Sequence, residues 1–515
     1  SAVLWALVLP FPYALVSPLY LGLAGWLVDM LPFVVLAGWA AVIGRWAWGL
    51  WQERRLPRGG RWIWLPIFLV GWMIVGLTAL DLSEIKHFIL LFSIQILISG
   101  TVLAVVDQLE DVEDRTKVVA GLMGFVVVLA VGVFLQWIGV PIQPLQDETV
   151  SARAEAAYGV DAFPNDTGMI KYARAQNGGA YDLTKKLERV ANDTGGLPPH
   201  EVFLPSTTAF GGGQLLIRFE GSARDYEDEL ADANVSLIFD NVGVAPANTV
   251  PRLRSFPRNA LTFAGLCAAL FPLGFFLLWS DDRRRQWLGR LAIIACLMGA
   301  GFSIARGAWA AILIGGIYLL IDGPLPWGRK MQYVGAFLAG AVVLTAVFML
   351  KYDSNPLTAR AGGDSSVEVR SNLYADTVQS LEPRYFVTGF GMTLSRDTDS
   401  TSYGELGEYV PPSGTHSTYL NYLFRMGIPG LLGILALYGL ALAHSRTAAR
   451  SFSGTRAVLA TLLATAVIIA AAHALILSLY VEPVYTLGIS LLLGLGMAHG
   501  KLPRSIIPWR KPTAA

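Results

Sequence analysis

Charged residues are scarce in this chain. Only 15% of its 515 residues are Asp, Glu, Lys or Arg, whereas 54% are hydrophobic. Soluble domains carry about 25% charged residues, so this balance excludes an ordinary soluble protein. The composition predicts an integral membrane protein.

Cysteine and a net excess of either charge are lacking as well. The two cysteines, Cys267 and Cys296, both fall inside apolar runs. A thiol in that setting usually acts as a small hydrophobic side chain, so we expect no disulfide framework. Lys and Arg number 39 against 38 Asp and Glu, which gives a formal net charge of +1. We therefore expect no nucleic-acid partner, and only the placement of the charges can be informative.

Signatures of metal and nucleotide chemistry are missing too. The sequence has no Cys/His cluster with zinc spacing, no glycine loop leading into Lys-Ser/Thr, and no acidic pair inside an apolar run. Asp29 and Glu482 are isolated and lie near the ends of apolar runs. We expect no cofactor, and these absences are consistent with a metal-independent mechanism.

What the chain does have is long apolar runs. Crossing about 30 Å of hydrocarbon takes roughly 20 helical residues, and about twelve runs of suitable length stand between charged or turn-rich breaks. Residue 1 begins directly in such a run, without a basic region or a small-residue cleavage site, so we expect a retained helix there. The expected spans are Val3–Leu21, Leu31–Trp51, Trp62–Leu80, His87–Val106, Val118–Ile138, Ala260–Trp279, Leu288–Ile304, Gly307–Ile321, Met331–Leu350, Ser417–Ala443, Ala457–Leu479 and Val484–Met497.

The short connections between these runs are basic, which predicts their side of the membrane. Loops rich in Lys and Arg are held on the cytoplasmic side. When the spans are threaded alternately, all the basic connections fall on one side, so both termini are expected in the cytoplasm. The acidic connection Asp107–Arg115 falls there too, which the rule tolerates. The basic connections are Gln52–Arg61, Asp281–Arg290, Pro326–Lys330, Ser445–Arg456 and the tail Lys501–Lys511.

Threading leaves two long polar segments outside. Val140–Arg258 is large enough for a small domain. It passes a helix-compatible stretch, Ala180–Asp193, then a β-like stretch, His200–Gly221, and a strand-compatible one, Ala233–Pro246. The strand ending in "IFDNVGV" after "LLIRFEG" resembles the closing strands of carbohydrate-binding jelly rolls; a generic β-rich cap fits equally well. Lys351–Thr415 carries an amphipathic helix pattern from Val369 to Leu381.

The predicted fold is therefore an all-α polytopic membrane protein of about 12 transmembrane helices, with an inserted extracytoplasmic α+β or β-rich domain and a second extracytoplasmic loop. Its expected parts are helices in 1–139, the inserted domain in 140–258, helices in 259–350, the second loop in 351–415, and helices with a cytoplasmic tail in 416–515.

Three ionisable residues stand out on the outer side. An ionisable group at a membrane boundary is costly, which makes it a functional candidate. Arg306, in "SIARGAWAA", lies opposite the basic loops; it is either a snorkelling residue or a fixed cation for an anionic ligand. Arg370 opens the amphipathic helix and is followed by "GFG" at Gly389–Gly391, which permits a tight turn or a close backbone approach. Alternative cations nearby are Arg360, Arg384 and Arg396.

His416 is the third, at the start of "HSTYLNYLFRMGIPGLLG". A single histidine at a helix end is most often a capping residue, but here Tyr419 and Asn421 follow it on the first turns. One neutral imidazole beside two arginines suits one task. The arginines hold a diphosphate, and the imidazole takes a proton from an attacking hydroxyl. We expect "GIPG" to be a close-packing or bending point deeper in the helix.

The ordered set of "SIARGAWAA", "VRSNLYADTVQSLEPRYFVTGFGMT" and "HSTYLNYLFRMGIPGLLG" resembles the O-antigen ligase and polymerase superfamily of polytopic glycosyltransferases. The resemblance covers about the last half of the chain and includes Arg254–Leu273, a stretch similar to the one that precedes the corresponding helix in the family. Further candidate site residues in these stretches are Tyr419, Asn421, Arg258 and Trp309.

This resemblance implies that Arg306 and Arg370 bind the undecaprenyl diphosphate of the donor and that His416 is the general base on an acceptor hydroxyl. The implied reaction is an inverting glycosyl transfer at the periplasmic face of a bacterial inner membrane. Its partners would be a lipid-linked oligosaccharide, a glycan or lipid-linked acceptor, membrane lipids, and a chain-length regulator or other assembly protein. Two departures bear on the acceptor: Ser417 stands where the family commonly has Asn, and the insertion is large.

Three alternatives stay open. The outer domain favours a repeat-unit polymerase slightly over a ligase that moves finished glycan to lipid A core or a protein. A flippase or transporter would need charges near the middle of the membrane or two related halves, and neither is present. A glycan-binding module with the helices as an anchor would not need so many spans.

Overall fold

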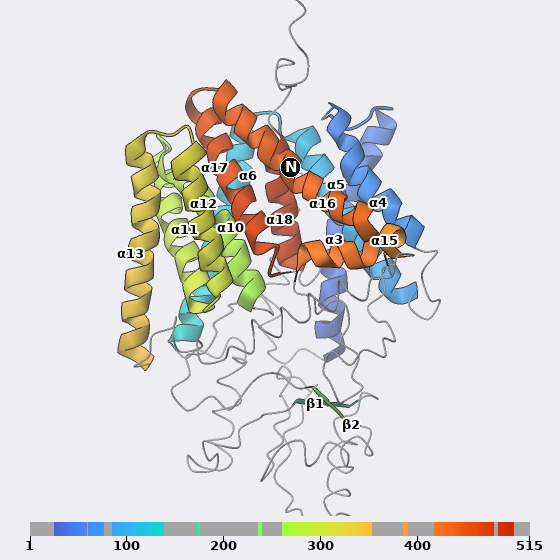
Figure 1. The fold of residues 1–515 in the computed structure, drawn as a ribbon, viewed down its shortest axis with the longest axis horizontal. Helices are drawn as coiled ribbons and strands as arrows, with labels where there is room; N and C mark the ends of the chain where they lie inside the picture. Colours follow the sequence, from blue (N-terminus) through green and yellow to red (C-terminus); the bar gives the residue numbers. More distant parts are fainter. Residues whose placement is uncertain are drawn as a thin grey trace, which may run out of the picture.

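The computed structural model describes residues 25–58, 60–76, 85–138, 172–175, 235–238, 260–352, 385–389, 417–477 and 483–498. Almost all of these residues form helices that stand side by side in one bundle (Figure 1). The helices are α3 (Gly25–Gln52), the 3₁₀ turn η1 (Gly60–Ile63), α4 (Trp64–Val75), α5 (Ile85–Gln108), α6 (Val112–Trp137), α10 (Ala260–Leu278), α11 (Arg283–Phe302), α12 (Arg306–Asp322), α13 (Trp327–Tyr352), α15 (Tyr385–Thr388), α16 (Thr418–Ser451), α17 (Gly454–His473) and α18 (Pro483–Met497).

The expected multi-pass membrane architecture is confirmed. Six of the described helices, α5, α6, α10, α13, α16 and α17, are long and apolar enough to cross a membrane, and α4 and α18 are shorter apolar helices. Every expected span except Val3–Leu21 coincides with a helix. Val3–Leu21 lies outside the described residues, so the total of about twelve spans stays a prediction.

Helix α10 forms the centre of the bundle because its sequence is apolar on all sides. It packs against α6, α11, α12, α17 and α18. Glycine allows the closest of these approaches. Gly289 of α11 lies against the backbone of Leu278, where a Cβ atom would overlap Leu278 N. Helix α13, by contrast, packs against α11 and α12 and lies at the edge of the bundle (Figure 1).

Some helices run beyond the hydrocarbon-length spans that hydropathy predicts. Helix α11 begins at Arg283 instead of Leu288, because Asp282 caps it by accepting a 2.9 Å hydrogen bond from Arg284 N. Helix α16 continues to Ser451 instead of Ala443. Charged residues extend both helices into the headgroup region, where they cost little.

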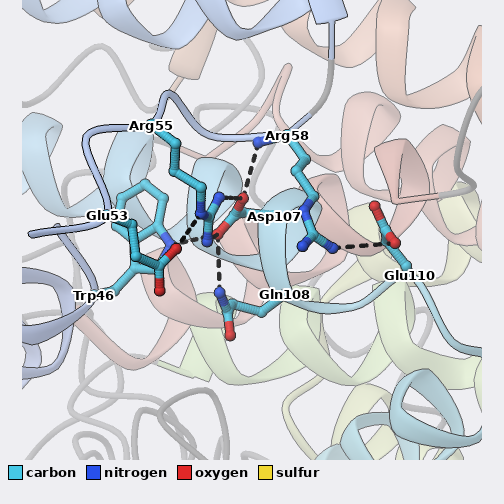
Figure 2. A network of polar contacts seen from close by, with 7 residues as sticks. All are labelled: Trp46, Glu53, Arg55, Arg58, Asp107, Gln108 and Glu110. Atoms are coloured by element: carbon cyan, nitrogen blue, oxygen red, sulfur yellow. Dashed lines mark hydrogen bonds and ion pairs between the residues drawn. The ribbon is translucent and has the colours of Figure 1, made fainter. Parts of the chain in front are cut away.

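The basic connections that the structure describes, those after α3, α10, α12 and α16, meet at one end of the bundle, as alternate threading predicts; the tail Lys501–Lys511 lies outside the described residues. Asp107 receives the most donors there (Figure 2). Its carboxylate accepts hydrogen bonds from Arg55 at 2.6 and 3.1 Å, from Arg58 N at 2.8 Å, from Trp46 at 3.0 Å and from Gln108 at 2.8 Å. The hydrogen bond to Asp107 is the largest cause of a raised pKa at Arg55. Asp107 thus ties the connection after α3 to the end of α5.

The segment expected to form an outer domain contributes two short strands. β1 (Tyr172–Ala175) pairs antiparallel with β2 (Val235–Ile238), with Tyr172 opposite Ile238. β2 falls on the strand-compatible stretch. The helix-compatible stretch Ala180–Asp193 lies outside the described residues, so the fold of 140–258 stays a prediction. The amphipathic pattern Val369–Leu381 lies outside them as well.

Candidate functional site

The turn between α11 and α12 places Arg306 at the end of the bundle opposite the basic connections. Ile304 has φ +48°, a left-handed conformation that is strained for a β-branched residue, and its N–H donates to Gly301 O at 2.9 Å. This conformation ends α11 and starts α12 within three residues. Arg306 is the first residue of α12 and is exposed. Strain of this kind is characteristic of functional sites.

The first turn of α12 is a favourable place for a bound anion. Ala305 is its N-cap and provides no side-chain hydrogen bond, and no acidic residue lies in the first turn. A helix N-terminus carries a partial positive charge. The guanidinium of Arg306 adds a full charge at the same place. Trp309, one turn on, is half-buried and packs its ring 5.4 Å from that of Phe337, which gives it a packing role.

The start of α16 is fastened to the turn that follows α17. Thr418 N donates to Ala474 O at 2.8 Å and to Leu477 O at 3.1 Å, and Thr418 Oγ1 donates to Leu477 O at 2.7 Å. Ser417 is the N-cap of α16, and its Oγ accepts from Leu420 N at 3.4 Å. The serine that departs from the family pattern therefore serves as a helix cap, as its residue type allows.

Gly307, the residue after Arg306, and Thr418, the residue after Ser417, both contact residues 474–477, which we call the α17 turn. Gly307 packs against Ile476 so closely that a Cβ atom at Gly307 would overlap the Ile476 side chain. Thr418 N donates to the carbonyl oxygens of Ala474 and Leu477, which flank Ile476 in this turn. Helices α12 and α16 are far apart in sequence, yet the first turn of each contacts the α17 turn. His416 is bonded to Ser417 but lies outside the described residues.

Tyr419 and Asn421 brace this arrangement. Tyr419 OH donates to Ala471 O at 2.9 Å, which adds a second connection between α16 and α17. Asn421 is fully buried, and its Nδ2 donates to Ser417 O at 3.0 Å. These contacts give both residues a structural role; whether they also contact a substrate stays a prediction.

Arg425 is a residue that the sequence analysis overlooked. It is 1% exposed, and its Nε donates to Asn421 Oδ1 at 3.2 Å. Ser417, Asn421 and Arg425 recur at i, i+4 and i+8, so they follow one face of α16 as a polar line that leads inward from the cap. An arginine inside an apolar run was the signal that could have found it.

The expected bend at "GIPG" is confirmed. Gly427 has φ +65° and ψ −165°, which breaks α16 into a short first part that crosses the bundle and a long second part that rises through it (Figure 1). Gly389, also with φ +65°, lies against the backbone of Gly427, so the close approach expected there is confirmed. Trp72 of α4 donates to Met426 O at 3.0 Å and satisfies a carbonyl that the bend releases.

The remaining candidates, Arg370 and Arg258, lie outside the described residues together with His416. Within the part of the chain that the structure describes, no three His, Cys, Asp or Glu side chains gather as a metal site requires. The expected metal independence stays a prediction. Cys267 and Cys296 are free thiols buried in the bundle.

Residues 291–435 match the family model described as O-antigen ligase. The matched range begins in α11 and ends beyond the bend in α16. It contains Arg306, Arg370 and His416, the three residues selected from the sequence. No curated protein matches the chain.

Proposed function

We propose that this chain, whose residues 291–435 belong to the O-antigen ligase family, transfers glycan from an undecaprenyl-diphosphate-linked donor to an acceptor hydroxyl. The transfer takes place at the outer face of the bacterial inner membrane. The observation that carries the proposal is that Gly307, beside Arg306, and Thr418, at the start of α16, both contact the α17 turn.

The arginines stabilise the leaving group. A diphosphate gains charge as its bond to the sugar breaks, and fixed guanidinium groups hold phosphate oxygens through bidentate contacts. Arg306 adds its charge to that of the α12 N-terminus, and Arg370 is the second clamp. Both act on the donor, so both contribute to donor binding and to the rate.

His416 acts on the acceptor. Its neutral imidazole accepts the proton of the attacking hydroxyl as the oxygen forms a bond to the anomeric carbon. The bond from that carbon to the phosphate oxygen breaks, and undecaprenyl diphosphate leaves from the opposite face. The anomeric configuration is therefore inverted. The braced first turn of α16 supports this role, because a general base needs a fixed position.

Two types of glycosyltransferase, which differ in their acceptor, are chemically possible. A repeat-unit polymerase is our first candidate, since the polar segment 140–258 is long enough to form a domain that holds a growing chain. The description of the matched family favours the second candidate, a ligase that moves one finished glycan to a lipid A core or a protein. The chemistry at the donor is the same in both.

Product length separates these candidates. Purified protein is incubated with lipid-diphosphate-linked repeat units in the presence of a chelator. A ladder of repeats on the lipid carrier identifies a polymerase, and one block on a non-isoprenoid acceptor identifies a ligase. Movement of labelled donor across proteoliposomes without bond formation would identify a flippase and overturn the proposal.

A measurement of donor binding tests whether Arg306 and Arg370 hold the diphosphate. Arg306→Ala removes one charged donor pair to phosphate, and loss of a charge-assisted hydrogen bond is expected to weaken donor binding by roughly 10- to 100-fold. Arg456→Ala is the matched control, because Arg456 is an exposed arginine at the opposite end of the bundle. Equal affinity of Arg306→Ala, Arg370→Ala and the control would remove the clamp from the mechanism.

A further inference from the structure

The basic end of the bundle, opposite the candidate site, has two unlike regions. Around α3, α5, α6, α12 and α16, several arginines pair with carboxylates. Arg55 contacts Asp107, Arg285 contacts Glu113 at 2.6 Å, and Arg446 and Arg450 both contact Asp322. These ion pairs join helices and leave little net charge.

Three arginines at the starts of α11 and α13 differ from this pattern, although Arg285 of α11 is paired. Arg283 and Arg290 are exposed and Arg329 is half-buried, and none of the three forms an ion pair with a described residue. Instead, Arg290 lies 4.8 Å over the Trp287 ring and Arg329 lies 5.2 Å over that of Trp279. These cations lie on aromatic rings and have no carboxylate partner.

The nearby carboxylates do not balance this charge. Residues 281–290 contain Asp281 and Asp282 against four arginines, and Arg329 and Lys330 add two cations from α13. Asp282 is occupied as the N-cap of α11 and as a 3.6 Å neighbour of Arg285. Lys330 donates to Leu320 O. A net positive charge therefore remains on this corner.

Exposed apolar side chains form a wall beside these cations along α11. Arg283, Trp287, Arg290 and Ile294 recur at helical spacing on the outward face of α11. Trp287 is 52% exposed and Ile294 is 53% exposed. We call this face, with the adjoining start of α13, the α11–α13 flank.

Helix α13 forms the second side of the wall. Gly340 packs against Leu297 and Gly301 packs against Leu344, so α13 runs parallel to α11. Its Leu338 and Val342 are 55% and 69% exposed. A molecule with an anionic head and an apolar body matches both parts of the flank.

We propose that the α11–α13 flank binds an anionic phospholipid of the surrounding membrane. The guanidinium groups of Arg283, Arg290 and Arg329 contact the phosphate of the headgroup, and the acyl chains lie along Ile294 and the outward face of α13. Arginine forms charge-assisted contacts with phosphate, tryptophan is favoured at the membrane interface, and basic residues near a membrane surface attract anionic lipids. The site is independent of the proposed glycosyl transfer, because it lies at the other end of the bundle.

The test measures lipid retention. The full chain is reconstituted with equal phosphatidylglycerol and phosphatidylcholine, purified again in detergent, and its bound lipids are counted by native mass spectrometry. We expect selective retention of phosphatidylglycerol. The variant Arg283→Gln/Arg290→Gln/Arg329→Gln is expected to bind it roughly 100-fold more weakly, because each basic residue near the surface contributes about a five-fold factor.

Two further variants keep the result interpretable. Arg446→Gln/Arg450→Gln alters paired arginines at the same end and should retain phosphatidylglycerol as the wild type does. Arg283→Lys/Arg290→Lys/Arg329→Lys keeps the charge and should retain most of the binding. Equal retention by the triple Gln variant, or no preference for phosphatidylglycerol in the wild type, would overturn the proposal. Glycerol phosphate that competes as strongly as the lipid would show that the apolar wall has no part in binding.

Discussion

At the residue scale, the hydroxyl of Thr418 determines how firmly α16 is held. Thr418→Val keeps the shape and the backbone hydrogen bonds but removes the 2.7 Å bond to Leu477 O. We expect a loss of about 1 kcal/mol in the free energy of unfolding and slower glycan transfer, because residue 416 is one position from the cap. Thr461→Val is the control, since Thr461 bonds only within α17, to Ala457 O. Similar transfer rates in both variants would show that the α17 turn does not position the site.

Some residue-scale features could be predicted and others could not. Arg306 was found because an arginine opposite the basic loops violates the charge bias of membrane proteins. The cap at Ser417 and the buried Arg425 were not found. Both roles are local, because serine is a common N-cap and Asn421 lies one helical turn before Arg425. What the sequence does not indicate is that Thr418 bonds to Ala474 and Leu477.

At the scale of elements, the bend in α16 requires glycine at residue 427. A Cβ atom there would lie 2.5 Å from the carbonyl oxygens of Phe386 and Val387, and φ is +65°. Gly427→Ala is expected to lower the free energy of unfolding by about 2 to 3 kcal/mol, as thermal unfolding would measure. Gly439→Ala lies in the same helix with open space around it and should be neutral or stabilising by up to about 1 kcal/mol. Equal effects would contradict the role of the bend.

The position of the bend was readable from "GIPG", since glycine and proline together interrupt a helix. The segment that packs against the bend could not be predicted from the sequence. Gly389 reaches Gly427 from a short helix that local sequence does not mark, and only tertiary packing selects that contact.

At the scale of the whole molecule, Asp107 connects elements at the basic end. Asp107→Ala removes the acceptor for Arg55, Trp46, Gln108 and the Arg58 amide, so we expect a loss of about 3 kcal/mol in stability. Transfer per folded molecule should stay unchanged, because the candidate site is at the other end. Glu110→Gln is the control: it alters an exposed pair with Arg58 and should change stability by less than about 1 kcal/mol. A large stability loss in the control, or none at Asp107, would contradict this account.

The arrangement of the whole bundle was largely predictable. Apolar runs of membrane length coincide with helices, and the basic connections meet at one end because charge placement constrains threading. The order of packing was not predictable, since helices that are apolar on all sides give no pattern that identifies their neighbours. The α17 turn, which the first turns of α12 and α16 both contact, follows from that packing.

Glycan transfer by His416→Ala is the most direct test of the proposed mechanism. The account predicts that transfer from the lipid diphosphate donor falls by at least about 100-fold, because a general base contributes on that order, while donor affinity stays as in the wild type. Transfer at the wild-type rate by a folded His416→Ala protein would contradict it.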